Sequence, residues 1–170
     1  EYRRATPIRL NQQEVNRLES QIRKNPYDIQ SYFDLFYVHR GIGNFNSARD
    51  TLRQLLRISP RSMNAQLLLV KLEHGARNFR EAHKACRNIL EAADQSNVTH
   101  EITVSTLIYA ILCEFHLERL DNVRSLVDIL LTVADEQEIS NLVIADELEM
   151  EWERIKNLLR NKTPACHPPG

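Results

Sequence analysis

The chain has 170 residues and a formal net charge of −1, and 42% of its residues are hydrophobic, an ordinary share for a globular domain with one core. No apolar run approaches the roughly 18 residues that a membrane-spanning helix needs, and no apolar stretch follows the first residues to make a secretory signal. Three cysteines without metal-ligand spacing favour an intracellular, reduced protein, in the cytoplasm or the nucleus.

The composition predicts an all-α protein. There are 4 Gly and 6 Pro, and three of the prolines stand in the last seven residues. The body of the chain therefore has few turn formers, while good helix formers such as Leu, Arg, Glu and Ala dominate it. We expect helices that are joined by short connections.

The N-terminal part is expected to contain a flexible lead, residues 1–10, and then one helix at about 11–24. Asn11 and Glu14 have the spacing of a capping box at the start of this helix. Apolar residues then recur on one face, at Val15, Leu18 and Ile22. Pro26 cannot continue a helix and so marks the start of the next unit.

An internal repeat follows, because residues 41–48 return as residues 75–82 at an offset of 34 residues. Gly, Asn, Phe and Ala recur at matching places in Gly41-Ile42-Gly43-Asn44-Phe45-Asn46-Ser47-Ala48 and Gly75-Ala76-Arg77-Asn78-Phe79-Arg80-Glu81-Ala82. The same offset joins Pro26 to Pro60, Leu35 to Leu69, Val38 to Leu72 and Leu55 to Ile89. The pattern predicts two helical units, at about 26–60 and 61–94.

Each unit is expected to be a pair of antiparallel helices. Gly41 and Gly75 stand where the first helix of each pair ends, and the left-handed conformation is easiest for Gly. Ala48 and Ala82 are expected where two helices approach too closely for a larger side chain. The expected pairs span about 29–58 and 63–92, with turns at 41–44 and 75–78.

A third, less regular pair is expected at about 101–134, after a polar loop at 94–100. Its two helices are predicted at 104–115 and 121–133, with an inner apolar set of Leu107, Ile111, Leu120, Val123, Val127 and Leu130. A last helix is expected at about 141–160, because Leu148, Trp152, Ile155 and Leu159 recur at helical spacing. The tail, 161–170, is expected to be disordered.

Residues 26–93 resemble the tetratricopeptide repeat, whose period is 34 residues. Leu35, Ala48, Leu55 and Pro60 fall on family positions in the first repeat, as do Leu69, Ala82 and Ile89 in the second. The chain departs from the family where Tyr32 and Gln66 replace the usual Trp, and where Phe36 and Val70 replace the usual Gly. The resemblance implies a right-handed superhelical stack of antiparallel helix pairs over residues 11–160, with three pairs plus flanking helices.

A second resemblance is to the half-a-tetratricopeptide type of repeat, which occurs in RNA-processing scaffolds. It rests on Asn25-Pro26-Tyr27-Asp28 before an aromatic first helix, and on Glu73 where that family carries an acidic residue. It implies membership of an RNA-processing complex as an alternative setting, without implying that the chain binds RNA.

The tetratricopeptide resemblance implies a protein–protein interaction scaffold that binds a peptide or an amphipathic helix of a protein partner. In that family the first helices of the pairs line a concave groove. The corresponding residues here are Phe33, Tyr37, Arg40, Leu67, Leu68, Lys71, Ile108, Tyr109, Leu112 and Phe115. Phe33 and Tyr37 are the expected anchors, because buried aromatics dominate binding energy at interfaces.

One alternative and one missing feature bear on this interpretation of the groove. The alternative is that some of these side chains belong to the core, or that the helix carrying Trp152 covers them. The family's clamp for the acidic tails of heat-shock chaperones, built from Lys, Arg and Asn, is missing, because its places hold Phe33, Tyr37, Leu68, Ser105 and Tyr109.

A basic face offers a different hypothesis, nucleic-acid binding. It comprises Arg49, Arg53 and Arg57 along one helix, with Lys84 and Arg87 on the next pair. A solvated helix face is the alternative, because no aromatic platform accompanies the stripe. The charged residues are also unevenly distributed: residues 1–100 contain 16 Lys/Arg and 10 Asp/Glu, whereas residues 101–150 contain 2 Lys/Arg and 11 Asp/Glu. A self-association module inside a larger assembly is the remaining hypothesis.

No catalytic constellation is recognised, so we expect no enzyme activity, cofactor, metal site or small-molecule substrate. His100-Glu101 is not followed by a second His at metalloprotease spacing, and Gly41-Ile42-Gly43 lacks the third Gly and the Lys of phosphate-binding loops. Cys86 lies on the inner stripe of its helix, which favours a packing thiol over a reactive one. Cys166-His167 falls in the expected tail, where no preorganised site can form.

Overall fold

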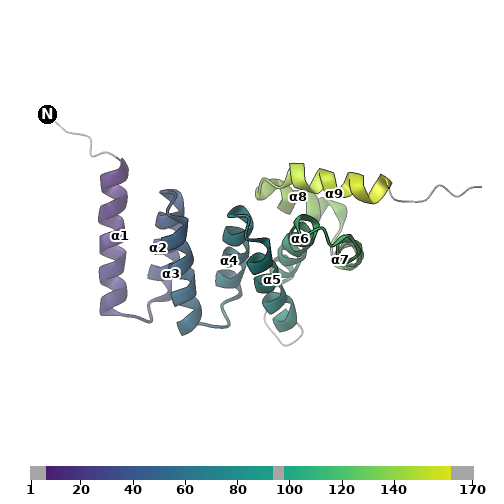
Figure 1. The fold of residues 1–170 in the computed structure, drawn as a ribbon. Helices are drawn as coiled ribbons and strands as arrows, with labels where there is room; N and C mark the ends of the chain where they lie inside the picture. The colour runs from purple at the N-terminus through teal and green to yellow at the C-terminus, as the bar shows by residue number, and fades with distance from the viewer. Residues whose placement is uncertain (1–6, 94–97, 162–170) are drawn as a thin grey trace, which may run out of the picture.

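A computed structural model describes residues 7–93 and 98–161, which form nine α-helices and no strand (Figure 1). The helices are α1 (Pro7–Lys24), α2 (Ile29–Gly41), α3 (Phe45–Ile58), α4 (Met63–Gly75), α5 (Phe79–Ala93), α6 (His100–His116), α7 (Leu120–Val133), α8 (Glu136–Ala145) and α9 (Glu149–Asn161). The predicted all-α stack of antiparallel helix pairs is confirmed.

The helices follow one another through space as they do in sequence (Figure 1). The upright helix α1 is followed by the pairs α2–α3 and α4–α5, which lie side by side, and α6–α7 continues the stack. The last hairpin, α8–α9, runs across the top of α6 and α7 instead of extending the row.

Four corners join the two helices of each pair by the same backbone turn. The residue in the left-handed conformation is Gly43, Arg77, Glu118 or Glu147, with φ of 77°, 62°, 60° and 58°. The next N–H donates to a carbonyl inside the preceding helix, as from Asn44 to His39 at 2.8 Å and from Leu148 to Val143 at 2.8 Å. This bond satisfies carbonyls that a helix end leaves unpaired.

The corners correct the role that the sequence suggested for two glycines. Gly41 and Gly75 were expected to be left-handed, but they are the last residues of α2 and α4. The left-handed residue comes two positions later, at Gly43 and at Arg77. A side chain at that position is strained but tolerated, because the turn is held by its own backbone bonds.

The C-terminal region also differs from the expected single helix at 141–160. The fourth corner, at Glu147, divides this segment into α8 and α9, so the described residues contain four pairs after α1. Asp135 begins α8 by accepting the N–H of Glu138 at 2.8 Å. Both ends of α8 are therefore fixed by short-range bonds that apolar spacing does not reveal.

The core runs along the stack between the helices of each pair. Ala48 and Ala82, predicted to lie where helices approach closely, are both 0% exposed, and this prediction is confirmed. The most enclosed helix is α6, in which every residue from Val104 to Glu114 is buried. It is apolar on most of its surface, because α5, α7 and the α8–α9 hairpin all pack against it, and its buried polar residues are Ser105, Thr106 and Glu114.

Parts of three expected segments lie outside the described residues: the lead at 1–10, the loop at 94–100 and the tail at 161–170. Of these, Pro7–Leu10 belong to α1, His100 opens α6, and Asn161 ends α9. None of the described helices is long and apolar enough to cross a lipid bilayer.

We expect Ala48→Leu and Ala82→Leu each to lower the free energy of unfolding by about 1–3 kcal/mol, because added methylenes overpack a filled contact. Ala145→Leu is the matched control, since Ala145 is an exposed helix residue and its substitution should change stability by less than about 0.5 kcal/mol. Chemical denaturation measures all three. Unchanged midpoints for the two buried variants would contradict the helix faces described above.

Candidate partner-binding groove

The first helices of the pairs, α2, α4 and α6, carry the ten residues that were predicted to line a groove. The structure places these residues in three environments. Tyr37 and Arg40 are exposed. Five are half-buried, namely Phe33, Leu67, Leu68, Lys71 and Phe115. Three on α6 are buried, namely Ile108, Tyr109 and Leu112.

The α8–α9 hairpin accounts for the burial on α6. Asp146, at the turn of the hairpin, accepts a hydrogen bond from the Tyr109 hydroxyl at 2.9 Å and pairs with the Lys71 ammonium at 3.0 Å. Burial and the neighbouring Asp146 carboxylate both raise the pKa of Tyr109, so this hydroxyl remains a donor. One carboxylate thus ties the hairpin to both α4 and α6.

A second carboxylate holds α9 against the same two helices. Glu151 contacts His74 of α4 at 3.2 Å and His116 of α6 at 2.5 Å. The hydrogen bond with His74, supported by the one with His116, lowers the pKa of Glu151 to about 2. The carboxylate is therefore ionised at neutral pH.

The expected groove is thus divided into a covered part and an open part. Over α6 the helix that carries Trp152 does cover the strip, which was the alternative noted from the sequence. Trp152 itself is half-buried and lines a separate hollow, together with Val127 and Leu131 of α7. The covering contacts come from Asp146 and Glu151, and from the buried Ile139, Val143, Leu148 and Ile155 of the hairpin, which share one core cluster with α6.

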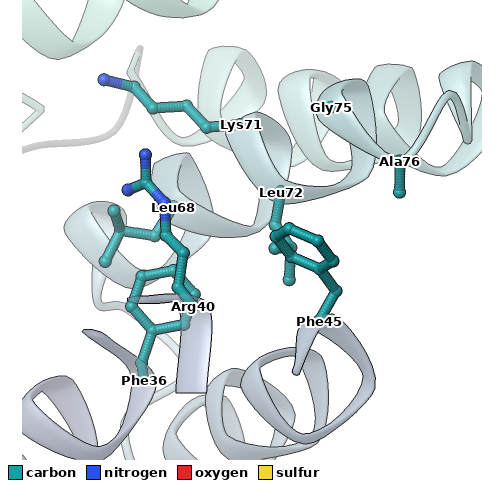
Figure 2. A pocket seen from close by; sticks show the side chains of 8 residues that line it. All are labelled: Phe36, Arg40, Phe45, Leu68, Lys71, Leu72, Gly75 and Ala76. Carbon is teal, nitrogen blue, oxygen red and sulfur yellow. The ribbon is translucent and has the colours of Figure 1, made fainter. Parts of the chain in front are cut away.

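The open part is a cleft of about 460 Å³ between α2, α3 and α4 (Figure 2). Its lining residues are Phe36, Arg40, Phe45, Leu68, Lys71, Leu72, Gly75 and Ala76. Arg40 and Lys71 come from different helices, α2 and α4, and Phe45 lies opposite Leu72 (Figure 2). The cleft therefore combines apolar walls with two cationic side chains.

The side chains of the cleft differ in how well they are satisfied within the molecule. The Phe45 ring is 52% exposed although it borders an apolar wall. The Arg40 guanidinium makes no hydrogen bond or ion pair with any residue that the structure describes, whereas Lys71 is paired with Asp146. The sequence indicated Phe45 only as a recurring member of the repeat. Its equivalent Phe79 is half-buried and stacks on His116, so recurrence alone could not show that Phe45 is open.

The predicted basic face is also divided by the structure. Arg49 turns inward and pairs with the buried Glu73 of α4, which also accepts from Asn78 at 2.7 Å. Arg53, Arg57, Lys84 and Arg87 are exposed. Lys84 and Arg87, on α5, border a shallow hollow of about 430 Å³ with Arg80, His83 and Arg119.

A contact like the one at Glu73 recurs in the next pair of helices, with a histidine in place of the arginine. His83 occupies the place of Arg49, 34 residues later, and contacts the buried Glu114 of α6 at 2.6 Å. In the first pair the corresponding residue of α2 is His39, whose buried Nδ1 has no partner among the described residues. Burial lowers the pKa of His39. The acidic residue that suggested the half-a-tetratricopeptide resemblance is thus a helix-to-helix contact here.

The two described cysteines, Cys86 and Cys113, are both 0% exposed. Burial raises the pKa of Cys113 to about 12 and that of Cys86 well above its ordinary value. Neither thiol ionises near neutral pH, so neither is an activated nucleophile.

Comparison with known proteins supports the fold. No family model matches the chain, and no curated protein sequence matches it significantly. A solved structure entitled "MamA 41-end from Desulfovibrio magneticus RS-1" is similar with a TM-score of 0.61 and 10% sequence identity, over 90% of this chain and 88% of that chain. The likeness supports a tetratricopeptide-like helical repeat, and at this identity it shows the fold alone.

We expect both buried thiols to react with a thiol reagent at least roughly a hundredfold more slowly in the native protein than in denaturant, because labelling requires local opening. The measurement uses a Cys166→Ser variant at pH 8, so that only Cys86 and Cys113 report. Rapid native labelling of Cys86 would contradict its assignment as a packing residue.

Proposed function

We propose that the protein is a non-catalytic scaffold that binds a peptide or helix of a partner protein in the open cleft between α2, α3 and α4. The observation that carries the proposal is the exposed Phe45 ring and the unpaired Arg40 guanidinium at one hollow. An apolar surface and a cation that stay unsatisfied in the free molecule are suited to a second molecule.

The chemistry of the cleft defines its occupant. The walls formed by Phe36, Phe45 and Leu72 fit an apolar side chain. Arg40 offers a forked donor that matches a carboxylate, or the carbonyls at the C-terminus of a helix. We therefore propose a segment in which an apolar anchor stands beside an acidic residue or ends a helix.

The lining also supports a binding role over a catalytic one. Phe, Leu, Gly and Ala supply most of it, and its charged residues are the two cations Arg40 and Lys71. Lys71 is already held by Asp146. The similarity to a solved helical structure at 10% identity is compatible with this role, but it does not indicate which partner this chain binds.

Nucleic-acid binding stands as a second candidate because of the hollow on α5. Arg80, Lys84, Arg87 and Arg119 border it, and three of these side chains lie on one helix. They could contact successive phosphates. The half-a-tetratricopeptide resemblance would place such a surface in an RNA-processing assembly. RNA affinity that falls steeply with salt and is lost in Lys84→Ala/Arg87→Ala would favour this function.

Gly75→Leu tests the cleft directly. A Cβ at Gly75 meets no atom within 4 Å, so the new side chain starts from open space. We expect stability to be unchanged or slightly higher, because Gly is a poor helix residue. Binding of peptides selected from a random display library on the wild-type protein should fall by at least about tenfold, or roughly 1.4 kcal/mol.

Gly41→Leu is the matched control for this variant. Gly41 occupies the same place one repeat earlier, also has open space at its Cβ, and does not line the cleft. It should bind the selected peptides like the wild type. Equal binding by Gly75→Leu, or selection of peptides without apolar and acidic residues, would contradict the proposal. A mass that doubles with concentration and is blocked by Gly75→Leu would identify a second copy as the occupant.

Tyr37→Ala tests whether the exposed aromatic beside the cleft is an anchor. Tyr37 is 52% exposed and contacts Phe36 edge to face, with ring centroids 5.2 Å apart. If it contacts the partner, its removal should weaken binding by about 2 kcal/mol, or some thirtyfold, with little change in melting temperature. Tyr27→Ala is the control, because Tyr27 is exposed outside the cleft. Full affinity with a large loss of stability would make Tyr37 a structural residue.

A further inference from the structure

Three side chains from distant parts of the sequence converge where α9 meets α4 and α6. They are His74, His116 and Glu151, and one donor atom of each lies within 4.8 Å of the other two. We infer that this cluster is a binding site for a divalent transition metal of the zinc class, with two imidazole nitrogens and one carboxylate oxygen as ligands and one open position.

The geometry of the free cluster is close to what a zinc ion requires. Tetrahedral bonds of about 2.1 Å place neighbouring ligand atoms about 3.4 Å apart. His74 Nε2 already lies 3.2 Å from Glu151 Oε2. His116 Nε2 lies 2.5 Å from the same oxygen and would have to move outward by somewhat less than 1 Å. A rotation of the Glu151 side chain, which stands near the start of α9, supplies a movement of this size. The two imidazole nitrogens lie within 4.8 Å of each other, so they would also have to approach by up to about 1.4 Å.

Both imidazole rings pack against aromatic neighbours with Nε2 directed toward Glu151. The edge-to-face contact between Tyr109 and His74 has ring centroids 5.3 Å apart. Phe79 stacks on His116 at 4.1 Å with an angle of 7° between the rings. A site whose ligands are already oriented loses less side-chain entropy when the ion binds.

The charges and the access to the cluster also suit a cation. Within the described part of the chain, the Glu151 carboxylate is paired with the two imidazoles, and the ammonium of Lys71 is paired with Asp146. The side chains of His74, His116 and Glu151 are 9%, 17% and 28% exposed, so an ion can reach them without unfolding the hairpin. Two nitrogens and one oxygen favour zinc over calcium or magnesium, which prefer oxygen alone.

Binding there would join three helices through one ion. The ligands stand on α4, α6 and α9, so the metal can form its full set of bonds only when the α8–α9 hairpin is docked. The metal would then stabilise the covered state of the groove by mass action. The role is structural or regulatory and does not depend on the proposed peptide function.

The experiment titrates metal-free protein with zinc by calorimetry and follows the melting temperature. All variants carry Cys166→Ser and His167→Ala, which remove other zinc donors in the C-terminal segment. We expect one saturable zinc site per chain and a rise in melting temperature of roughly 5–10 °C at a zinc concentration about a hundredfold above Kd. Cobalt in place of zinc should give the intense visible absorption of a four-coordinate ion.

Glu151→Gln and His116→Gln test the ligands with little change in shape. Each should weaken zinc binding by more than about tenfold, because removing even a hydrogen-bond partner of a metal ligand lowers metal affinity by about that factor. The melting temperature of each metal-free variant shows first that it is folded. His100→Ala is the control, because His100 is largely exposed, at 60%, and pairs with Glu138 elsewhere on the surface. Its zinc affinity should equal that of the parent.

Two results would overturn the assignment. One is the absence of saturable zinc binding by the folded parent protein. The other is zinc binding that persists with unchanged affinity in folded Glu151→Gln and His116→Gln. Either result would show that the three residues form a hydrogen-bonded cluster that binds no metal. Neither result bears on peptide binding in the open cleft, so the two proposals fail independently.

Discussion

The docking of the last hairpin on α4 and α6 determines which part of the inner face of the stack stays open. Asp146 and Glu151 reach donors on α4 and α6 that point to the inner side of the stack. Together with the buried Ile139, Val143, Leu148 and Ile155, these bonds cover the inner face of α6 and leave α2 and the adjacent side of α4 open.

Much of the stack could be predicted from the sequence because its information is local. The 34-residue offset, the alanines at close helix contacts and the apolar stripes all reflect neighbours within one pair or the next. Ala48 and Ala82 were therefore placed correctly, as were the pairs around them. The corner was located correctly too, but its left-handed residue was not, because a turn held by backbone bonds accepts Arg77 and Glu118 as well as Gly.

The candidate site could be predicted only in part, because its limits depend on contacts between residues far apart in sequence. No spacing rule relates Lys71 to Asp146 or His74 to Glu151, which come together only through the path of the hairpin. For the same reason the sequence placed Arg49 in an exposed basic stripe, although its partner Glu73 lies on the next helix. Apolar periodicity reports which face of a helix is buried, and it does not report what buries it.

The contacts of the hairpin also give the two halves of the molecule different modes of unfolding. At the N-terminal end, Val15 and Leu18 of α1 form a small separate cluster with Leu35, so that end depends on one neighbour and can fray by itself. At the other end, residues of α4 through α9 share one continuous cluster. Pulling apart any helix there exposes several others at once. The chain thus joins a segment that opens stepwise to a segment that opens as one cooperative block, and the open cleft lies where the two meet.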